Sequence, residues 1–389
     1  MRKIWPFGFY FLIFAGVASH GPYRVLYYQS LSFTGAQIGL LAGIAPLITL
    51  VSAPFVTGLA DRTNRHGLIM SLSLLAVISG LVLFPYLKTF IPVFGMAILS
   101  SVFFSPIMPL SNSATMFMLG DERNLYSRIR LGGTIGFGIV ATLAGSLVEN
   151  YGLKIAFWSA AGLFFIAFLV SQKLVHGGEE SGKPADKGRA SDLLKNPHFL
   201  LFLLIGFSGG ISFATINTYL FPYMKELGAG ESMMGLALTI GTIAEIPVLF
   251  FASRFIKRFK TYVLVIFSIA MTGLRFLLLA VAANPVFVLF VQLLNGFNYP
   301  LLYVAGVTYA DQHAPKGFRA TVQGLFNASM GGIGSAVGGF AGGLLFESMG
   351  AKGMYLILCI FVALVLAFVS LVHRTLPPEQ DGVPLTHST

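Results

Sequence analysis

The chain has 389 residues, of which 56% are hydrophobic and only 10% are charged, and its formal net charge is +10 at pH 7. A water-soluble globular domain of this composition would expose so much apolar surface that it would aggregate. The composition therefore excludes a soluble enzyme and indicates an integral membrane protein. The one cysteine, Cys359, excludes an intrachain disulfide, and a buried thiol is its simplest interpretation.

Apolar runs follow one another along the chain with only short polar interruptions. Each is close to the roughly 20 residues that cross a bilayer as a helix. The predicted helices cover residues 5–29, 36–58, 67–87, 90–119, 131–149, 154–175, 198–224, 232–254, 261–282, 285–310, 319–346 and 351–373. The first run begins after Arg2 and Lys3 and has no small-residue cleavage site, so we interpret it as a retained helix.

Lysine and arginine are distributed unevenly over the predicted loops. The side that carries the N-terminus also carries the basic residues of segments 62–65, 123–130, 173–195, 254–260 and 316–319, and Arg374. The opposite side carries only Lys88, Lys154, Lys225 and Lys352. By the positive-inside rule, both termini are expected in the cytoplasm, in a multi-pass protein of the cell (inner) membrane. The positive charge is thus explained by topology, and no nucleic-acid partner is expected.

The chain is predicted to consist of two similar halves. A polar segment at 176–197 separates an N-terminal six-helix bundle (1–175) from a C-terminal six-helix bundle (198–373), which is followed by a cytoplasmic tail (374–389). The sequence RIRLGGTIGFG at 128–138 has a counterpart in RATVQGLFNASMGGIG at 319–334. A duplicated bundle joined by a cytoplasmic linker is typical of transporters whose halves move about a central site.

The segment after the second predicted helix contains Gly58, Asp61, Arg62 and Arg65. A glycine permits close helix approach and an aspartate accepts hydrogen bonds from a cation or helix end, so these residues are a candidate cytoplasmic gate. An ordinary basic stop sequence is the alternative. In this position the segment resembles the signature between the second and third helices of the major facilitator superfamily.

Three further stretches resemble the oligosaccharide, nucleoside and phenylpropionate proton-symporter group of that superfamily. This group includes the lactose permease. The three stretches are YSRIRLGGTIGF at 126–137, AEIP at 244–247 and LRF at 274–276. The resemblance extends over essentially the whole chain. It implies an all-α membrane protein with about twelve transmembrane helices in two pseudo-symmetric six-helix bundles, the major facilitator fold.

Two ionisable residues are predicted deep in the membrane, Glu245 in the eighth helix and Arg275 in the ninth. Charges there are costly unless they are paired or functional. One interpretation is a structural ion pair that locks the two helices. The other is that Glu245 carries a proton and Arg275 controls its charge state, which would make both part of the coupling and substrate site. The resemblance places Glu245 where relatives carry an acid important for substrate or proton.

The N-terminal half offers Arg130, Asn112 and Phe137. By resemblance, Arg130 matches a substrate-binding arginine, Asn112 stands where relatives usually have an acid, and Phe137 replaces an aromatic residue on which sugars stack. The missing acid favours a solute that is negatively charged or rich in acceptors. The alternative for Arg130 is an anchor at the cytoplasmic end of its helix.

The tenth helix carries amides where the relatives carry titratable side chains. Asn295 and Asn298, three residues apart, can bind a solute but cannot carry a proton, so either Glu245 is the only carrier or transport is not proton coupled. Interhelical hydrogen bonding is the alternative role for both. Asn217 and Tyr219 in the seventh helix are further candidate substrate contacts. In the first helix, we interpret His20 as a helix-end hydrogen bonder and Arg24 as reaching the outer headgroups.

Together these features predict a secondary active transporter that moves a sugar, nucleoside or aromatic or organic acid by alternating access, with proton symport. The alternative is a proton-independent uniporter or exchanger of an organic anion. The chain contains no catalytic or ATP-binding motif, so no enzyme activity, cofactor or metal is expected. The expected partners are the small solute, a proton and the lipid bilayer, with the protein acting as a monomer.

Overall fold

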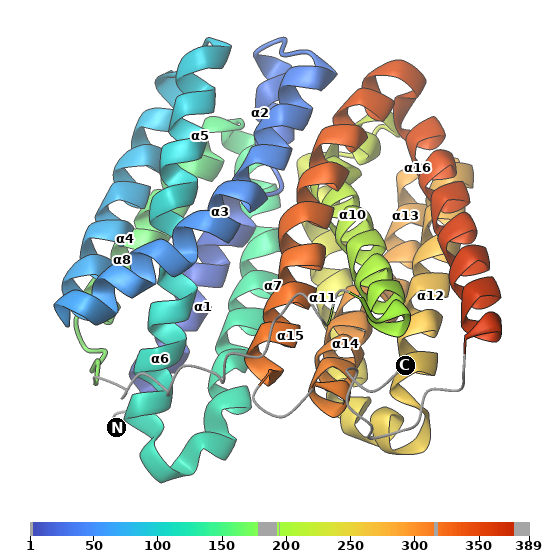
Figure 1. The fold of residues 1–389 in the computed structure, drawn as a ribbon. Helices are drawn as coiled ribbons and strands as arrows, with labels where there is room; N and C mark the ends of the chain where they lie inside the picture. Colours follow the sequence, from blue (N-terminus) through green and yellow to red (C-terminus); the bar gives the residue numbers. More distant parts are fainter. Residues whose placement is uncertain (1–2, 178–192, 194, 315–317, 377–389) are drawn as a thin grey trace. The chain divides into compact units, whose positions relative to one another are not determined.

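The computed structural model describes residues 3–177, 193, 195–314 and 318–376, and every regular element in them is a helix (Figure 1). The predicted linker and tail lie largely outside these described residues. The first elements are α1 (Ile4–His20), α2 (Arg24–Ser30), α3 (Gly35–Thr63), α4 (His66–Leu83), η1 (Phe84–Tyr86), α5 (Phe90–Phe104), α6 (Ile107–Leu119), η2 (Gly120–Leu125), α7 (Tyr126–Tyr151) and α8 (Lys154–Ser171). They are followed by α10 (Pro197–Glu226), α11 (Glu231–Arg258), α12 (Thr261–Val281), α13 (Pro285–Val291), η3 (Gln292–Phe297), α14 (Tyr299–His313), α15 (Arg319–Asn327), η4 (Ala328–Gly334) and α16 (Ser335–Thr375).

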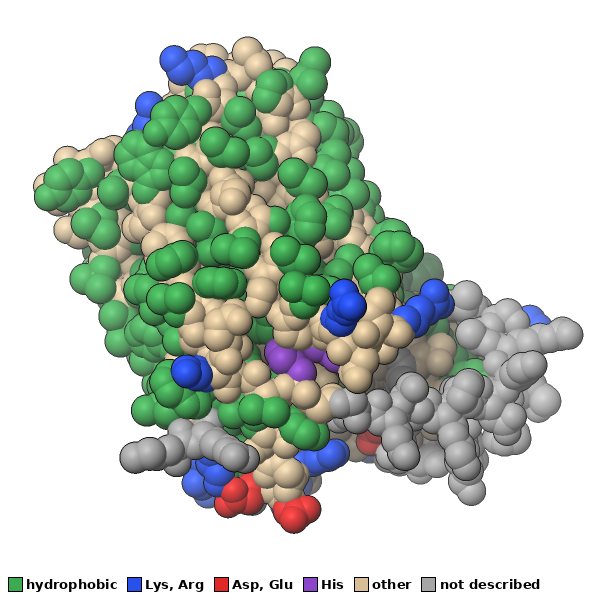
Figure 2. Space-filling view, turned by 90° about the vertical axis from the view of Figure 1, so that its left-hand side faces the viewer, with side chains coloured by type: hydrophobic (Ala, Val, Ile, Leu, Met, Phe, Trp, Pro, Cys, Tyr) green, Lys and Arg blue, Asp and Glu red, His purple; other side chains and the backbone are tan. Residues whose placement is uncertain are grey.

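Large hydrophobic side chains project outward from many of these helices. Phe55 is 75% exposed, Ile91 is 80% exposed and Phe250 is 73% exposed. On the face in Figure 2, hydrophobic side chains cover the middle, and most of the charged side chains lie toward the upper tip and the lower third. Apolar surface of this extent is tolerated in lipid and not in water, so the helices are membrane spans.

Eleven helical stretches of the described residues are long and apolar enough to cross a bilayer. The last of them, Thr321–Thr375, has 55 residues and is interrupted at Gly350, whose φ of 70° lies in the left-handed region. One crossing takes about 20 residues, so this stretch corresponds to the last two predicted helices. The predicted all-α membrane fold is thereby confirmed.

Two predicted helix ends need correction. The second predicted helix stops at residue 58, whereas α3 continues to Thr63 and ends where Asn64 adopts a left-handed conformation (φ 51°). Asparagine tolerates that conformation better than other non-glycine residues, so it terminates helices. The fifth predicted helix starts at residue 131, whereas α7 starts at Tyr126. Asp61, Arg128 and Arg130 therefore lie on helices.

The described residues form two compact units. The first unit contains residues of Met1–Gly182 and Met224–Thr242, and the second contains residues of Lys183–Tyr223 and Ile243–Thr389. In the first unit, α1 packs against α7 and α8, and α4 packs against α5 and α8. In the second unit, α12 packs against α14 and α16.

Glycines let the first helix of each unit approach a later one closely. A Cβ atom at Gly136 of α7 would lie 2.3 Å from the carbonyl oxygen of Phe11 in α1, and one at Gly133 would lie 2.7 Å from the Phe14 ring. In the second unit, a Cβ atom at Gly338 of α16 would lie 2.4 Å from the carbonyl oxygen of Ile211 in α10. The same kind of small-residue contact thus recurs in the two units, as an internal repeat requires.

Candidate functional site

A chain of hydrogen-bonded polar side chains, buried at one end and half-buried at the other, lies in the second unit. Asn295 in η3 donates through Nδ2 to Glu245 Oε1 in α11 at 2.6 Å. Arg275 in α12 donates from Nη1 to Asn295 Oδ1 and from Nη2 to Gln292 Oε1, both at 2.5 Å. Only 3% of Arg275 and 2% of Gln292 is exposed. The half-buried carboxylate is therefore linked to the buried guanidinium through an amide.

The structural ion pair that the sequence left open as one interpretation is not a direct contact among the described side chains. Among the described side chains, Asn295 lies between the two charges, and its amide group uses one donor and one acceptor to connect them. The local fold explains why. A Cβ atom at Gly296 would lie 2.4 Å from the carbonyl oxygen of Ala244, so the glycine allows η3 to lie directly against α11.

A pocket adjoins this polar chain within the second unit. Its lining residues come from α10, α12, η3 and α14 and are Gly209, Ser212, Phe213, Ile216, Asn217, Thr272, Arg275, Asn295, Asn298, Tyr299 and Leu302. Asn298 is only 3% exposed, yet its Oδ1 and Nδ2 atoms have no hydrogen-bond partner among the described residues. Because buried amides are normally hydrogen-bonded, this side chain is available to a bound molecule.

An aromatic platform lies at the same pocket. The rings of Phe213 and Tyr299 stack with centroids 3.9 Å apart and an angle of 26°, and Tyr299 also stacks on Tyr303. Phe213 remains 37% exposed. Asn217 lies one turn after Phe213 and donates to the Phe213 carbonyl oxygen at 2.8 Å. The pocket thus combines an aromatic ring with amide groups and the Arg275 guanidinium.

The first unit has its own polar cluster around Arg130 of α7. Asn112 Oδ1 of α6 accepts hydrogen bonds from the Tyr10 hydroxyl at 2.8 Å and from Arg130 Nη1 at 3.4 Å. Arg130 Nη1 also lies 3.3 Å from the Tyr126 hydroxyl. The guanidinium carbon is 5.8 Å from the Tyr10 ring centroid and 6.0 Å from the Phe14 centroid. These partners of Arg130 are all uncharged.

The structure therefore brings Arg130 and Asn112 together, and separately Glu245, Arg275, Asn295, Asn298 and Asn217. Phe137 lies half-buried on α7, two turns after Arg130. Tyr219 lies elsewhere, because its hydroxyl donates to the Gly339 carbonyl oxygen at 2.6 Å and its ring stacks on Phe346. Its hydrogen-bonding capacity is used in packing α10 against α16.

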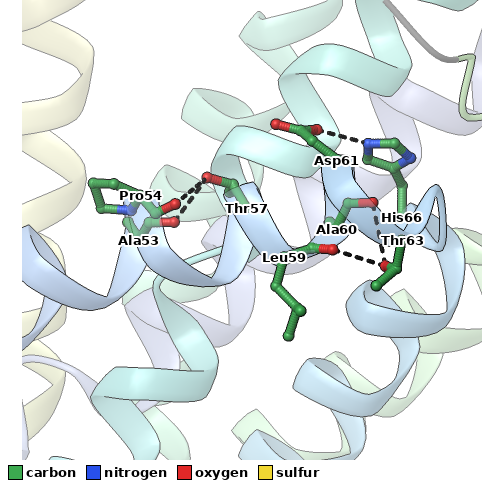
Figure 3. Close-up of polar contacts among 8 residues, drawn as sticks. All are labelled: Ala53, Pro54, Thr57, Leu59, Ala60, Asp61, Thr63 and His66. Atoms are coloured by element: carbon green, nitrogen blue, oxygen red, sulfur yellow. Dashed lines mark hydrogen bonds and ion pairs between the residues drawn. The ribbon is translucent and has the colours of Figure 1, made fainter.

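The candidate gate forms a local contact between two neighbouring helices. Asp61 near the end of α3 accepts a 2.8 Å hydrogen bond from His66 at the start of α4 (Figure 3). Arg62 and Arg65 are exposed, and a Cβ atom at Gly58 would meet nothing within 4 Å. The close helix approach predicted at Gly58 is absent from the described residues, because the neighbouring helices leave that position open.

Three aromatic contacts were not anticipated from the sequence. Tyr10 and Tyr126 contact Arg130 or its asparagine partner, and Phe213 forms half of the platform in the second unit. A signal existed for the first of these, since Tyr10 and Phe14 are four residues apart and share one face of α1. Which neighbour that face meets depends on helix packing, which the sequence does not contain.

An all-helical membrane protein with buried polar clusters along its helices has the construction of a solute transporter. The family model described as the MFS_1 like family matches residues 4–357, and the chain belongs to this family. The maltose permease of Geobacillus stearothermophilus is 26% identical over 386 residues, which cover 97% of each chain. The xanthosine permease of Escherichia coli (strain K12) is 24% identical over 376 residues, which cover 90% of this chain and 88% of the permease.

The fold is likewise that of a solved transporter. The crystal structure of a mutant of the nucleoside transporter NupG superposes with a TM-score of 0.85 at 18% identity, over 95% of this chain and 99% of that one. The chain is thus a multi-pass membrane transporter of the major facilitator superfamily, as predicted, and its relatives are permeases and not enzymes. A small solute and a lipid bilayer are its partners.

Proposed function

We propose that the chain transports a nucleoside, or a comparable uncharged sugar-bearing solute, by alternating access with proton symport. The observation that carries this proposal is the Glu245–Asn295–Arg275–Gln292 chain beside the pocket of the second unit. The negative charge of Glu245 and the positive charge of Arg275 offset each other through Asn295, so the site does not favour a charged solute. This favours an uncharged solute over the acid to which the sequence inclined.

The remaining pocket groups support a nucleoside in particular. The stacked Phe213–Tyr299 pair offers an aromatic face. Any nucleobase can stack on such a face, because every base has a flat π surface. The buried, unpartnered amide of Asn298 offers one donor pair and one acceptor, which suit a base edge or a ribose hydroxyl. The names of the relatives agree with this class, since they include a xanthosine permease, a maltose permease and the nucleoside transporter NupG.

Proton coupling in this proposal resides at Glu245. Its carboxylate accepts a hydrogen bond from Asn295, so a proton on the carboxyl group would weaken that contact and leave the Arg275 charge unbalanced. An acceptor group of the solute can then take a hydrogen bond from Arg275 Nε, which has no partner among the described residues. Proton and solute would then favour each other's binding, as symport requires. The proposed orientation keeps both termini in the cytoplasm.

The second candidate function is exchange of an organic anion without protons. It is favoured by Arg130, whose contacts in the first unit are all to uncharged groups. A guanidinium without a carboxylate partner can bind a carboxylate or phosphate in two-point contact.

Counterflow into proteoliposomes separates the two functions. Vesicles loaded with unlabelled solute would be tested with labelled uridine, inosine, xanthosine, maltose and uridine monophosphate. We expect exchange of at least one nucleoside and no exchange of the nucleotide, whose phosphate is not matched by the neutral pocket. Exchange confined to anionic compounds would overturn the nucleoside proposal and support the anion exchanger.

A further inference from the structure

A second pocket, distinct from both polar clusters, lies inside the first unit. It is formed by α1 to α5, η1 and α8. Its lining includes His20, Arg24, Thr49, Ser100, Phe104 and Phe157. His20 lies ten residues after Tyr10, which places the pocket about 15 Å further along the helix axis than the Arg130 cluster. The proposed transport site does not use these residues.

The protonation of His20 follows from its two contacts. Its Nδ1 atom is 2.7 Å from the Gly16 carbonyl oxygen, which can only accept, so Nδ1 carries the hydrogen. Its Nε2 atom is 3.2 Å from Arg24 Nη2, which can only donate, so Nε2 must be an acceptor. His20 is therefore neutral, and only 6% of it is exposed. The neutral His20 ring holds the Arg24 guanidinium in place but does not neutralise its positive charge.

Arg24 is the only lysine, arginine, aspartate or glutamate among the lining residues of this pocket. Its contact to His20 uses one of the five N–H donors of a guanidinium. No ion pair of Arg24 is present among the described residues. Arg24, which the sequence predicts to reach the outer headgroups, is held by His20 at the wall of this pocket.

The other walls of the pocket are mostly apolar, so they suit the hydrophobic part of a ligand. Phe84, Phe104 and Phe157 provide aromatic surface, and Leu41, Val77 and Leu81 provide aliphatic surface. Gly80 lets α4 lie close to α5 at this wall, since a Cβ atom there would lie 3.0 Å from Ser100 Oγ. Small-molecule sites are built in the same way, with mostly apolar walls and few polar anchors.

We propose that this pocket binds an amphipathic anion, with a carboxylate or phosphate on Arg24 and an apolar body between α3, α4, α5 and α8. A guanidinium held in place by a neutral acceptor keeps its full charge and most of its donors for such a head group. The ligand can be a free organic carboxylate or an acidic membrane lipid, which share this chemistry.

Binding of octanoate to the purified transporter tests the proposal, measured by titration calorimetry in a non-ionic detergent. Octanamide, which has the same body without the charge, is the matched probe, and Arg128→Gln, an exposed arginine of the same unit, is the matched variant. We expect octanoate to bind, octanamide to bind at least about tenfold more weakly, and Arg24→Gln to weaken octanoate about 10- to 100-fold. Arg128→Gln should bind octanoate like the wild type.

The lipid source is tested in parallel by native mass spectrometry from nanodiscs that contain phosphatidylglycerol or phosphatidylcholine. Retention of phosphatidylglycerol that is lost in Arg24→Gln would identify a lipid head group, whereas octanoate binding alone would identify a free carboxylate. Ala97→Leu fills the pocket without removing charge and should reduce either form of binding, which keeps the test valid if Arg24→Gln misfolds. Binding of both anions that is unchanged in both variants, or binding of neither anion, would overturn the proposal.

Discussion

Arg275 donates a 2.5 Å hydrogen bond to Asn295 Oδ1, so the buried guanidinium reaches the Glu245 carboxylate through an amide and not directly. Because the amide of Asn295 is hydrogen-bonded to both charged groups, protonation of Glu245 changes the hydrogen bonding of Arg275. No direct salt bridge has to break. This relationship underlies the proposed coupling of proton and solute.

Replacing Asn295 by leucine should disrupt both stability and transport. The substitution keeps the branched shape of the side chain but removes its donor and its acceptor, and each buried group left unpaired costs about 1–3 kcal/mol. We expect a lower unfolding temperature in detergent and at least a tenfold loss of nucleoside counterflow. Asn150→Leu, at an exposed amide of α7, is the control. A variant Asn295→Leu with wild-type stability and counterflow would show that the bridge has no role.

The aromatic platform should carry a measurable part of solute affinity. Stacking on an aromatic ring contributes about 1–3 kcal/mol per base, so Phe213→Ala is expected to weaken nucleoside binding about 5- to 100-fold, and Phe213→Tyr should retain it. Phe267 is 41% exposed and does not line the pocket, so Phe267→Ala is the matched control. Competition of unlabelled nucleoside in counterflow measures the affinities. Equal affinities for the Phe213→Ala and Phe267→Ala variants would exclude the platform from the binding site.

The small-residue contact between α1 and α7 should be sensitive to a single methyl group. A Cβ atom at Gly136 would lie 2.3 Å from the Phe11 carbonyl oxygen, so Gly136→Ala forces the two backbones apart at a cost of about 1–3 kcal/mol. At Gly162 in α8 a Cβ atom meets nothing within 4 Å, and alanine there should be neutral or slightly stabilising. Thermal unfolding of both variants checks this expectation, and equal unfolding temperatures would contradict it.

One histidine outside the membrane spans should make stability depend on pH. Burial, and then the neighbouring His66, lower the pKa of His176, whose ring stacks on that of His66 with centroids 6.2 Å apart. The folded state therefore resists protonation, and its stability should be fully present above about pH 6.5 and decrease as the pH falls below it. His176→Gln should show a smaller decrease in unfolding temperature between pH 7.5 and 5.5. Identical pH profiles would refute this role.

Much of the fold could be predicted from the sequence, because lipid imposes long apolar helices and charge asymmetry on the chain. The break between the last two helices was predicted and lies at Gly350, where the backbone needs a positive φ. The end of α3 was placed too early, because the polar residues Asp61 and Arg62 were taken for a loop although they lie on its last turns. Composition indicates where a helix leaves the membrane, and the capping residue determines where it ends.

Less of the candidate site could be predicted. Glu245, Arg275 and Asn295 were each identified from their types and depth, but the position of the amide between the two charges depends on the close contact of η3 with α11 at Gly296. Tyr219 was expected at the solute and instead bonds to Gly339, because one sequence does not reveal which helix faces a given side chain. Residue types therefore supplied the candidate residues, and the contacts between them required the structure.

The most direct test of the central claim is to measure solute-driven proton movement and counterflow in the same proteoliposomes, for the wild type and for Glu245→Gln. Asp121→Asn, an exposed acid in the first unit, is the control. We expect that a nucleoside alkalinises the external medium with the wild type and the control, and that Glu245→Gln still exchanges the nucleoside without moving protons. Transport by the wild type without proton movement, or proton movement that persists in Glu245→Gln, would contradict it.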